Sequence, residues 1–169
     1  MNPVIIDGFL KPDEFKKLQT YMMSPDFQWR FMPVIDRIDE EGDKFQFVHL
    51  FYQNCKPTSP DYSILAPVFR AIEMKSLYRI KANLLTKTPK IIENEFHYDV
   101  SDFTPEQAKH WTTSILYINS NNGYTKFETG ASFESIENRL VTFPANLKHT
   151  GSSCSDEKVK IVINFNYFT

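Results

Sequence analysis

The sequence predicts an α+β fold that is mainly β, in which antiparallel strands form a sandwich or jelly roll and N-terminal helices back one sheet. Two helix-like segments precede Ser76, and six strand-like segments lie on or beyond it. Turns rich in Pro, Asn, Gly and Ser separate the strand-like segments. Strands at this density, after two helices, are expected to pair antiparallel. At 169 residues, the chain fits one domain that spans residues 1–169.

The first elements are a short strand, a turn and a helix. Val4-Ile5-Ile6 has the composition of a strand, and Asp7-Gly8 that of a turn. Pro12 then lies where a first helical residue is favoured, and the two acidic residues after it suit the positive end of the helix dipole. Apolar residues follow at helical spacing: Phe15, Leu18 and Met22. We predict that this apolar stripe faces the core.

A strand and a second helix are predicted next. Three aromatic residues and one histidine alternate with other residues and so share one face of a strand: Phe45, Phe47, His49 and Phe51. His49 is therefore expected to be packed among aromatic rings and not to bind a ligand. Four apolar residues then have helical spacing: Ile64, Leu65, Val68 and Ile72. Pro67 has to lie in the first turn of that helix.

The rest of the chain predicts the strands of the two sheets. Their expected ranges are Leu77–Thr86, Ile91–Asp99, Thr112–Asn119, Tyr124–Glu128, Arg139–Phe143 and Val159–Phe168. Asn121-Asn122-Gly123 is expected to form the turn before the fourth of them.

The last strand has two unlike faces. One is almost entirely apolar: Val159, Ile161, Ile163, Phe165 and Tyr167. The other carries Lys158, Lys160, Val162, Asn164 and Asn166. Lys and Asn are ordinary on a solvent-exposed face, but this face could equally line a polar funnel at the mouth of the jelly roll.

Composition excludes several classes of protein. With 41% hydrophobic and 24% charged residues, the chain is neither disordered nor of low complexity. A formal net charge of −2 provides no global positive field for nucleic acid or an anionic membrane, although a local basic patch could still exist. Cys55 and Cys154 are too few for a disulfide framework, and reduced thiols in a cytoplasm are expected. The start of the chain lacks the pattern of a signal peptide, and no apolar run approaches the length of a membrane span.

Three side chains suggest a metal site. His97 and Asp99 lie two residues apart, and His149 follows 52 residues after His97. In a strand, side chains two residues apart point the same way, about 6–7 Å from each other, so His97 and Asp99 could bind one ion. Two imidazoles and one carboxylate are the ligands of a non-haem Fe(II) centre, which leaves other coordination positions open. Such a short pattern also occurs by chance among loop and strand residues, so its context has to agree.

Several segments in the same order resemble the Fe(II)- and 2-oxoglutarate-dependent oxygenases, and among them the prolyl-hydroxylase-like group with its small bacterial and phage versions. The matching segments are residues 4–10, Arg79-Ile80-Lys81-Ala82-Asn83, His97-Tyr98-Asp99, residues 115–119, residues 139–144, His149-Thr150-Gly151 and the final strand. The resemblance covers most of the chain. It implies a double-stranded β-helix of the jelly-roll or cupin type.

The resemblance also implies roles for individual residues. His97, Asp99 and His149 would hold Fe(II) as the catalytic centre. Lys160, eleven residues after His149, would bind the far carboxylate of 2-oxoglutarate, with Lys158 as the second choice on the same face. Asn164 lies on that face too and joins the predicted cosubstrate-binding set. Tyr117 could donate its hydroxyl to the same carboxylate, or could equally be a buried aromatic residue with a polar tip.

The implied reaction uses 2-oxoglutarate and O₂, gives succinate and CO₂, and hydroxylates a substrate. A prolyl residue in a protein or peptide is the leading expectation. The alternatives are a nucleobase or small metabolite as substrate, or a catalytically inactive binding domain on the same jelly roll. Nucleic acid is a disfavoured partner, and no membrane partner is expected. We expect a soluble protein of the cytoplasm, which would be the host's if a phage encodes it; the sequence does not indicate the oligomeric state.

The connection after Asp99 is long and polar. Residues 100–111 include Pro105 and would lie beside the metal, as a lid or as an unremarkable surface loop. Asp102 and His110 belong to it but lack the strand parity of His97 and Asp99, so neither is predicted to be a ligand.

Overall fold

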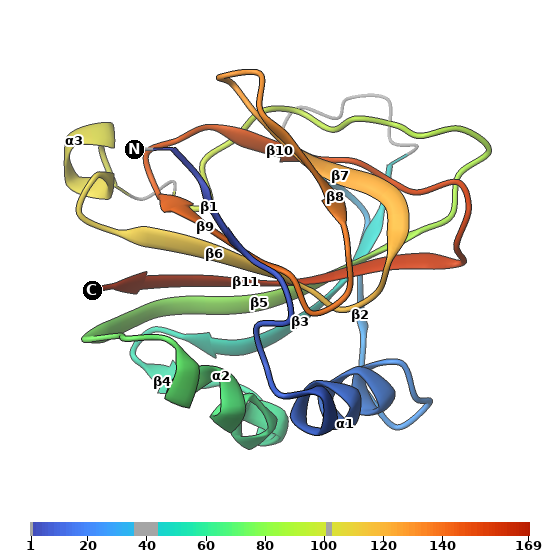
Figure 1. Ribbon diagram of the computed structural model, residues 1–169, viewed down its shortest axis with the longest axis horizontal. Helices are drawn as coiled ribbons and strands as arrows, with labels where there is room; N and C mark the ends of the chain where they lie inside the picture. The colour runs from blue at the N-terminus through green and yellow to red at the C-terminus, as the bar shows by residue number, and fades with distance from the viewer. Residues whose placement is uncertain (1, 36–43, 101–102) are drawn as a thin grey trace.

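The computed structural model describes residues 2–35, 44–100 and 103–169, and consists of two antiparallel sheets with helices on the outside of the larger one (Figure 1). The larger sheet has the order β1 (Val4–Ile6), β9 (Leu140–Pro144), β6 (Thr112–Tyr117), β11 (Val159–Phe168), β5 (Ser76–Thr86), β3 (Gln46–Gln53) and β2 (Arg30–Met32), and β4 (Lys56–Pro57) pairs with β3. The smaller sheet has the order β10 (His149–Gly151), β7 (Asn121–Phe127) and β8 (Ser132–Ser135). The predicted mainly β fold, a jelly roll with N-terminal helices backing one sheet, is confirmed.

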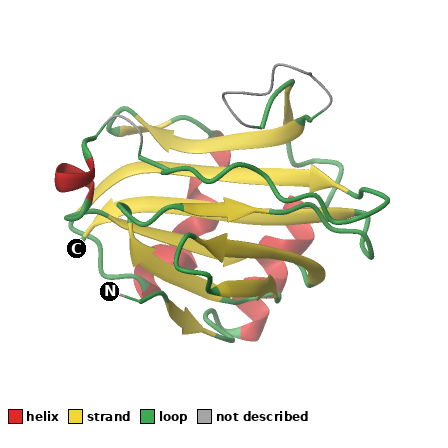
Figure 2. Ribbon diagram, turned by 90° about the horizontal axis from the view of Figure 1, so that it is seen from above, coloured by secondary structure: helices red, strands yellow, loops and turns green. Residues whose placement is uncertain are grey.

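The helices cover one face of the larger sheet, as Figure 2 shows from above. They are α1 (Pro12–Met22), the 3₁₀ helix η1 (Pro60–Leu65) and α2 (Ala66–Ala71). The predicted apolar stripe of α1 is buried in the core against this sheet, together with residues of η1, α2, β5 and β11. The predicted second helix is real but is divided: Leu65 ends η1, and Pro67 lies in the first turn of α2.

Strand alternation separates this core from the space between the sheets. In β11, Ile161, Ile163 and Phe165 belong to the core under the helices. Lys160 and Asn164 point the other way and line a cavity between the sheets. Beside that cavity, a second apolar cluster joins the two sheets: Ile115, Tyr117, Phe127, Val141 and Phe143. The polar face of the last strand is therefore a lumen face and not a solvent face.

Two predicted elements are wrong. Residues 91–99 do not form a strand: only Glu93 and His97 make isolated bridges, to Ser152 and His149. Asn121-Asn122-Gly123 is not a turn, because β7 begins at Asn121 and contains an irregularity between Asn121 and Tyr124. Both errors concern backbone whose hydrogen bonds depend on partners distant in the sequence.

Four short strands were not predicted: β2, β4, β8 and β10. Each has two to four residues, too few for a periodic pattern to be visible. A short helix, α3 (Pro105–Ala108), lies in the connection between Asp99 and β6. In the described part of the chain, no helix is both long and apolar enough to cross a membrane.

Candidate metal centre

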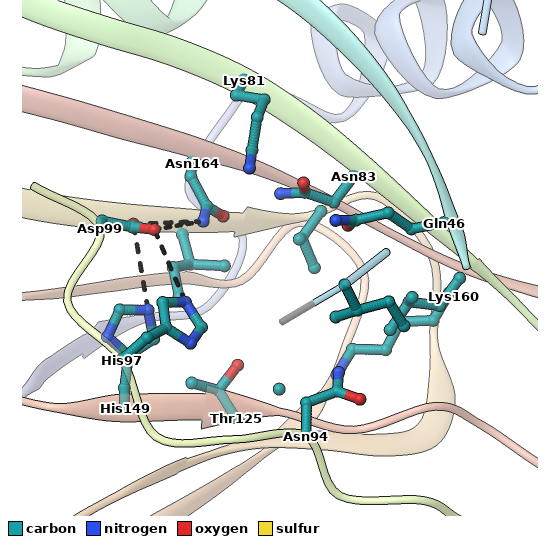
Figure 3. Close-up of a pocket in the computed structure, with 15 residues that line it drawn as sticks. Gln46, Lys81, Asn83, Asn94, His97, Asp99, Thr125, His149, Lys160 and Asn164 are labelled. Carbon is teal, nitrogen blue, oxygen red and sulfur yellow. Dashed lines mark hydrogen bonds and ion pairs between the residues drawn. The ribbon is translucent and has the colours of Figure 1, made fainter. Parts of the chain in front are cut away.

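The side chains of His97, Asp99 and His149 converge at one end of the cavity between the sheets (Figure 3). One ligand atom from each lies within 4.8 Å of the others. Nε2 of His97 is 3.9 Å from Asp99 Oδ1, and Nε2 of His149 is 3.9 Å from Asp99 Oδ2. These separations are too long for hydrogen bonds. The three groups therefore face one another across a space that could hold an ion.

The chain brings the three residues together by a backbone bridge. His97 N donates to His149 O at 2.9 Å, and His149 N donates to His97 O at 3.1 Å. His149 opens β10, which is paired with β7 in the smaller sheet. The expected convergence of His97 and Asp99 is thus present, although it arises from this single bridge and not from a regular strand.

Neighbouring groups hold the candidate ligands in place. The Asp99 carboxylate accepts hydrogen bonds from the side-chain amides of Asn164, at 3.2 Å, and Asn166, at 3.3 Å. Arg79 Nη2 donates to Asp99 O at 2.6 Å and lies 3.5 Å from Oδ1. Nδ1 of His97 is 3.1 Å from Glu95 O and can donate to it, which leaves Nε2 facing Asp99. Such outer contacts orient metal ligands and tune their basicity.

The charges of the three groups fit a divalent cation. Burial alone would raise the pKa of Asp99, but the combined influence of His149, Arg79, His97 and Lys81 lowers it well below its usual range. Burial lowers the pKa of His149 to about 4, so its ring is neutral at pH 7. The Asp99 carboxylate and the neutral His149 imidazole are the forms in which these groups bind a metal. No hydrogen bond joins the three groups at their present separations of 3.9 Å, and a metal ion between them would bind all three.

The cavity that contains these groups has a volume of about 660 Å³, including its open mouth. Most of its polar lining comes from six further residues: Gln46, Lys81, Asn83, Asn94, Thr125 and Lys160. In Figure 3, the metal-ligand candidates lie at one end and Lys160 lies at the other. The side chain of His97 is 44% exposed, whereas those of Asp99 and His149 are each 4% exposed. The candidate metal position is therefore accessible from the His97 side.

Of the two lysines predicted to bind 2-oxoglutarate, Lys160 lines the cavity and Lys158 does not. Its side chain is buried, and Nζ donates to Tyr124 O at 2.6 Å and to Ser152 O at 3.0 Å. Two of the three ammonium N–H groups are used in this way, which leaves one for a ligand. Burial lowers the pKa of Lys160 to about 7. Lys158 is exposed and does not line the cavity.

The other two predicted cosubstrate residues have different positions. Asn164 lines the cavity, but its amide donates to Asp99 and so helps to orient a candidate metal ligand. Tyr117 is fully buried and does not line the cavity; its hydroxyl donates to Thr125 Oγ1 at 2.7 Å. Burial raises the pKa of Tyr117 to about 12. Thr125, which sequence reasoning missed, provides the hydroxyl at the cavity wall.

Gly123 determines how closely β7 approaches Lys160. A Cβ at this position would lie 2.8 Å from Asn121 Oδ1, 2.8 Å from Ser153 O and 2.9 Å from Lys160 Cδ. None of these three atoms can easily move away. Asn121 Oδ1 accepts a hydrogen bond from Gly123 N, Ser153 O belongs to the backbone, and the side chain of Lys160 is held by two carbonyls. The site therefore has no room for a larger residue.

We expect Gly123→Ala to lower the free energy of unfolding by about 1–3 kcal/mol, the usual cost of overpacking. Urea unfolding measures it. Gly151→Ala is the matched control, because its Cβ would meet nothing within 4 Å. Equal losses in the two variants would contradict the close-packing argument.

The remaining histidines are not part of this centre. His49 is buried between Phe27 and Phe51, with Nδ1 2.7 Å from Gln28 O and Nε2 2.8 Å from Ser59 Oγ, so the prediction of a packed histidine is confirmed. His110 is exposed. Asp102 lies outside the described residues.

In the connection after Asp99, the described residues are held in place by a contact between two aromatic side chains. The rings of Phe103 and Trp111 stack with centroids 5.4 Å apart, and Val100 is buried. These contacts show anchoring at both ends of the connection.

No protein-family model and no curated protein matches the sequence. Solved structures do match the fold. An oxidoreductase of the 2OG-Fe(II) oxygenase family from Burkholderia pseudomallei has a TM-score of 0.68 and 10% identity, over 98% of this chain and 84% of that chain. A non-haem α-ketoglutarate-dependent carbocyclase from nogalamycin biosynthesis has a TM-score of 0.69 and 10% identity, over 98% and 79%.

A viral collagen prolyl hydroxylase from Paramecium Bursaria Chlorella virus-1 has a TM-score of 0.57 and 15% identity, over 100% of this chain and 91% of that chain. These identities are low, so the likeness establishes the fold and not the reaction. The chain has the jelly-roll fold of 2-oxoglutarate-dependent oxygenases. A function for the chain therefore depends on its own side chains.

Proposed function

We propose that this chain is an Fe(II)- and 2-oxoglutarate-dependent dioxygenase in which His97, Asp99 and His149 hold the metal. The observation that carries the proposal is the arrangement of one cavity: two imidazoles and a carboxylate converge at one end, and a buried lysine lies at the other. A dicarboxylate that chelates a metal with one end needs a cation for its other end. The fold, which is that of known oxygenases, agrees with this reading.

Each part of the cavity then has a chemical task. Bound iron, with 2-oxoglutarate and O₂, supplies the oxidising chemistry and yields succinate and CO₂. Asp99 contributes a negative charge that Asn164, Asn166 and Arg79 hold in position. Lys160 binds the far carboxylate of 2-oxoglutarate through its remaining N–H. Leu85, Ile115 and Val162 line the cavity with apolar surface that excludes water from the reacting groups.

For the primary substrate, we propose a prolyl residue of a protein or peptide. The likeness to a collagen prolyl hydroxylase, together with the open His97 side of the centre, supports this choice. A small metabolite is the second candidate, because the fold is more similar to the nogalamycin carbocyclase, with a TM-score of 0.69 against 0.57. Succinate release with proline-containing peptides, compared with release with free metabolites, decides between the two.

An anaerobic titration tests the proposed metal and cosubstrate together. Addition of Fe(II) and then 2-oxoglutarate should produce the metal-to-ligand charge-transfer absorption of a bidentate complex. With O₂ and a competent substrate, succinate should form in equal amount to a product heavier by one oxygen. A protein that binds Fe(II) but gives no such absorption with 2-oxoglutarate would contradict the proposal.

The affinity for 2-oxoglutarate should depend on pH through Lys160. Its pKa is lowered to about 7 by burial, so the ammonium form that binds a carboxylate is lost as the pH rises above 7. Carboxylate binding favours that form, so the Kd should stay nearly flat below pH 7. It should rise roughly eightfold between pH 7.5 and 8.5.

Calorimetry on the Co(II)-loaded protein, which avoids turnover, measures this effect. Lys160→Arg is the control, because a guanidinium stays protonated throughout this range. Its Kd for 2-oxoglutarate should be nearly independent of pH. A slope in Lys160→Arg equal to that of the wild type would assign the pH dependence to another group.

A further inference from the structure

Strand β5 carries a row of three polar side chains on its lumen face. Arg79, Lys81 and Asn83 alternate with Ile80 and Ala82, which are buried in the core under the helices. Arg79 donates to Asp99. Lys81 and Asn83 line the cavity itself. Lys81 therefore adds a second ammonium group to a cavity in which the proposed reaction already uses Lys160.

Lys81 differs from Lys160 in having no hydrogen-bond acceptor. Nζ of Lys160 is held by two backbone carbonyls, whereas Nζ of Lys81 makes no hydrogen bond with any residue in the described part of the chain. Figure 3 shows its ammonium pointing into the cavity between Asn164 and Asn83. The carboxylate of Asp99 attracts Lys81 but is already bound by two amides and Arg79. A partly buried ammonium without a protein acceptor is costly unless water or a ligand provides one, and a carboxylate is the stronger acceptor of the two.

The charges of the cavity indicate which ligand group is missing. Among its described lining residues, Asp99 is the only acid, and Lys81 and Lys160 are the cations beside two histidines. Asp99 is already contacted by Arg79. In the proposed reaction, the near carboxylate of 2-oxoglutarate binds the metal and the far carboxylate binds Lys160. Lys81 then has no anionic partner among the described lining residues or in the cosubstrate, and an anionic group of the primary substrate would provide one.

We propose that Lys81 binds a carboxylate of the primary substrate and so selects substrates that carry one near the carbon to be oxidised. The inference rests on the proposed function and narrows its substrate class. The carboxylate could belong to a free amino acid or chain terminus, or to an acidic side chain next to the reacting residue. Lys81 recognises the same chemistry in each case.

Binding to the Co(II)-loaded protein with 2-oxoglutarate tests this without turnover. Three pairs of probes differ in one carboxylate: L-proline and L-prolinamide, a peptide with C-terminal proline and its C-terminal amide, and a peptide with internal Pro-Asp and its Pro-Asn counterpart. We expect at least one pair to show a preference of about tenfold to a hundredfold for the carboxylate, as for a charge-assisted hydrogen bond. The pair that shows it identifies the source of the carboxylate.

Lys81→Met, which keeps the stem without the charge, should reduce this preference to about one. Lys81→Arg should retain most of it. The matched control is Lys87→Met, an exposed lysine just beyond the same strand, which should behave as wild type. The Kd for 2-oxoglutarate should change less than about threefold in all of these variants.

Two results would overturn the inference. One is a wild-type protein that prefers the carboxylate in none of the pairs. The other is a Lys81→Met variant that keeps the preference or loses 2-oxoglutarate affinity instead, which would assign Lys81 to the cosubstrate. Binding of 2-oxoglutarate to the wild type, measured first, tests the proposed function separately.

Discussion

Replacing His149 with alanine is expected to weaken Fe(II) binding by more than roughly a hundredfold, because loss of a ligand should exceed the effect of losing a supporting contact. Nε2 of His149 is one of the three candidate ligand atoms that the described residues bring together, and burial keeps its ring neutral. His97 and Asp99 alone would leave the ion with two protein ligands. An anaerobic Fe(II) titration measures the affinity, and turnover should fall to background.

The control is His110→Ala, which removes an exposed histidine outside the cavity and should leave Fe(II) affinity unchanged. Because the His149 ring also packs against Phe143, with centroids 4.8 Å apart, its removal costs packing energy as well. Circular dichroism and urea unfolding therefore have to show that His149→Ala is folded. A folded variant that binds Fe(II) as tightly as wild type would refute the assigned centre.

The most predictable elements are those whose local pattern is long. The range predicted for β11, Val159–Phe168, is the observed one, because ten residues alternate between an apolar and a polar face. Helix α1 was equally clear, since Pro12 marks its start and a three-residue apolar stripe follows. In both cases, local propensity and burial favour the same structure.

Elements held only by distant partners could not be predicted. Residues 91–99 contain many strand-forming side chains, yet their backbone pairs only at Glu93 and His97. Strand β10 has three residues and exists because it pairs with β7. Asn121-Asn122-Gly123 has the composition of a turn, but Asn121 pairs with Ser135 of β8, so the segment begins strand β7. Tertiary contacts override local preference at these positions.

The residues of the candidate site also differ in how far local sequence could predict them. The candidate metal ligands were proposed from their spacing, an assumed strand and the family resemblance, and the assumed strand is absent. Lys160 was proposed from the resemblance and from its parity in the last strand, which the structure contains. Arg79, Asn166 and Thr125 were not assigned roles, because these depend on which loop or strand lies opposite. Lys81 could have been found from the sequence: its parity in β5 is opposite to that of Ile80 and Ala82, which places it on the lumen face.

Replacing Lys160 with alanine is expected to raise the Kd for 2-oxoglutarate by about one to two decades. A charge-assisted hydrogen bond contributes about 1.5–3 kcal/mol, and Lys160 offers its remaining N–H at the far end of the cavity from the metal. Fe(II) affinity in the absence of 2-oxoglutarate should be unchanged, because Lys160 lies at the opposite end from the candidate ligands. Calorimetry with each ligand separates the two effects.

Lys158→Ala is the matched control for this prediction, since Lys158 lies just before β11 and only two residues from Lys160 but differs from it in position. Lys158 is exposed, whereas Lys160 is buried and lines the cavity. Lys158→Ala should therefore leave the Kd for 2-oxoglutarate within about twofold of wild type, the range of an exposed charge whose effect is screened. If Lys158→Ala weakens 2-oxoglutarate binding more than Lys160→Ala does, the far carboxylate is bound outside the cavity, and the assignment of its buried end to the cosubstrate is wrong.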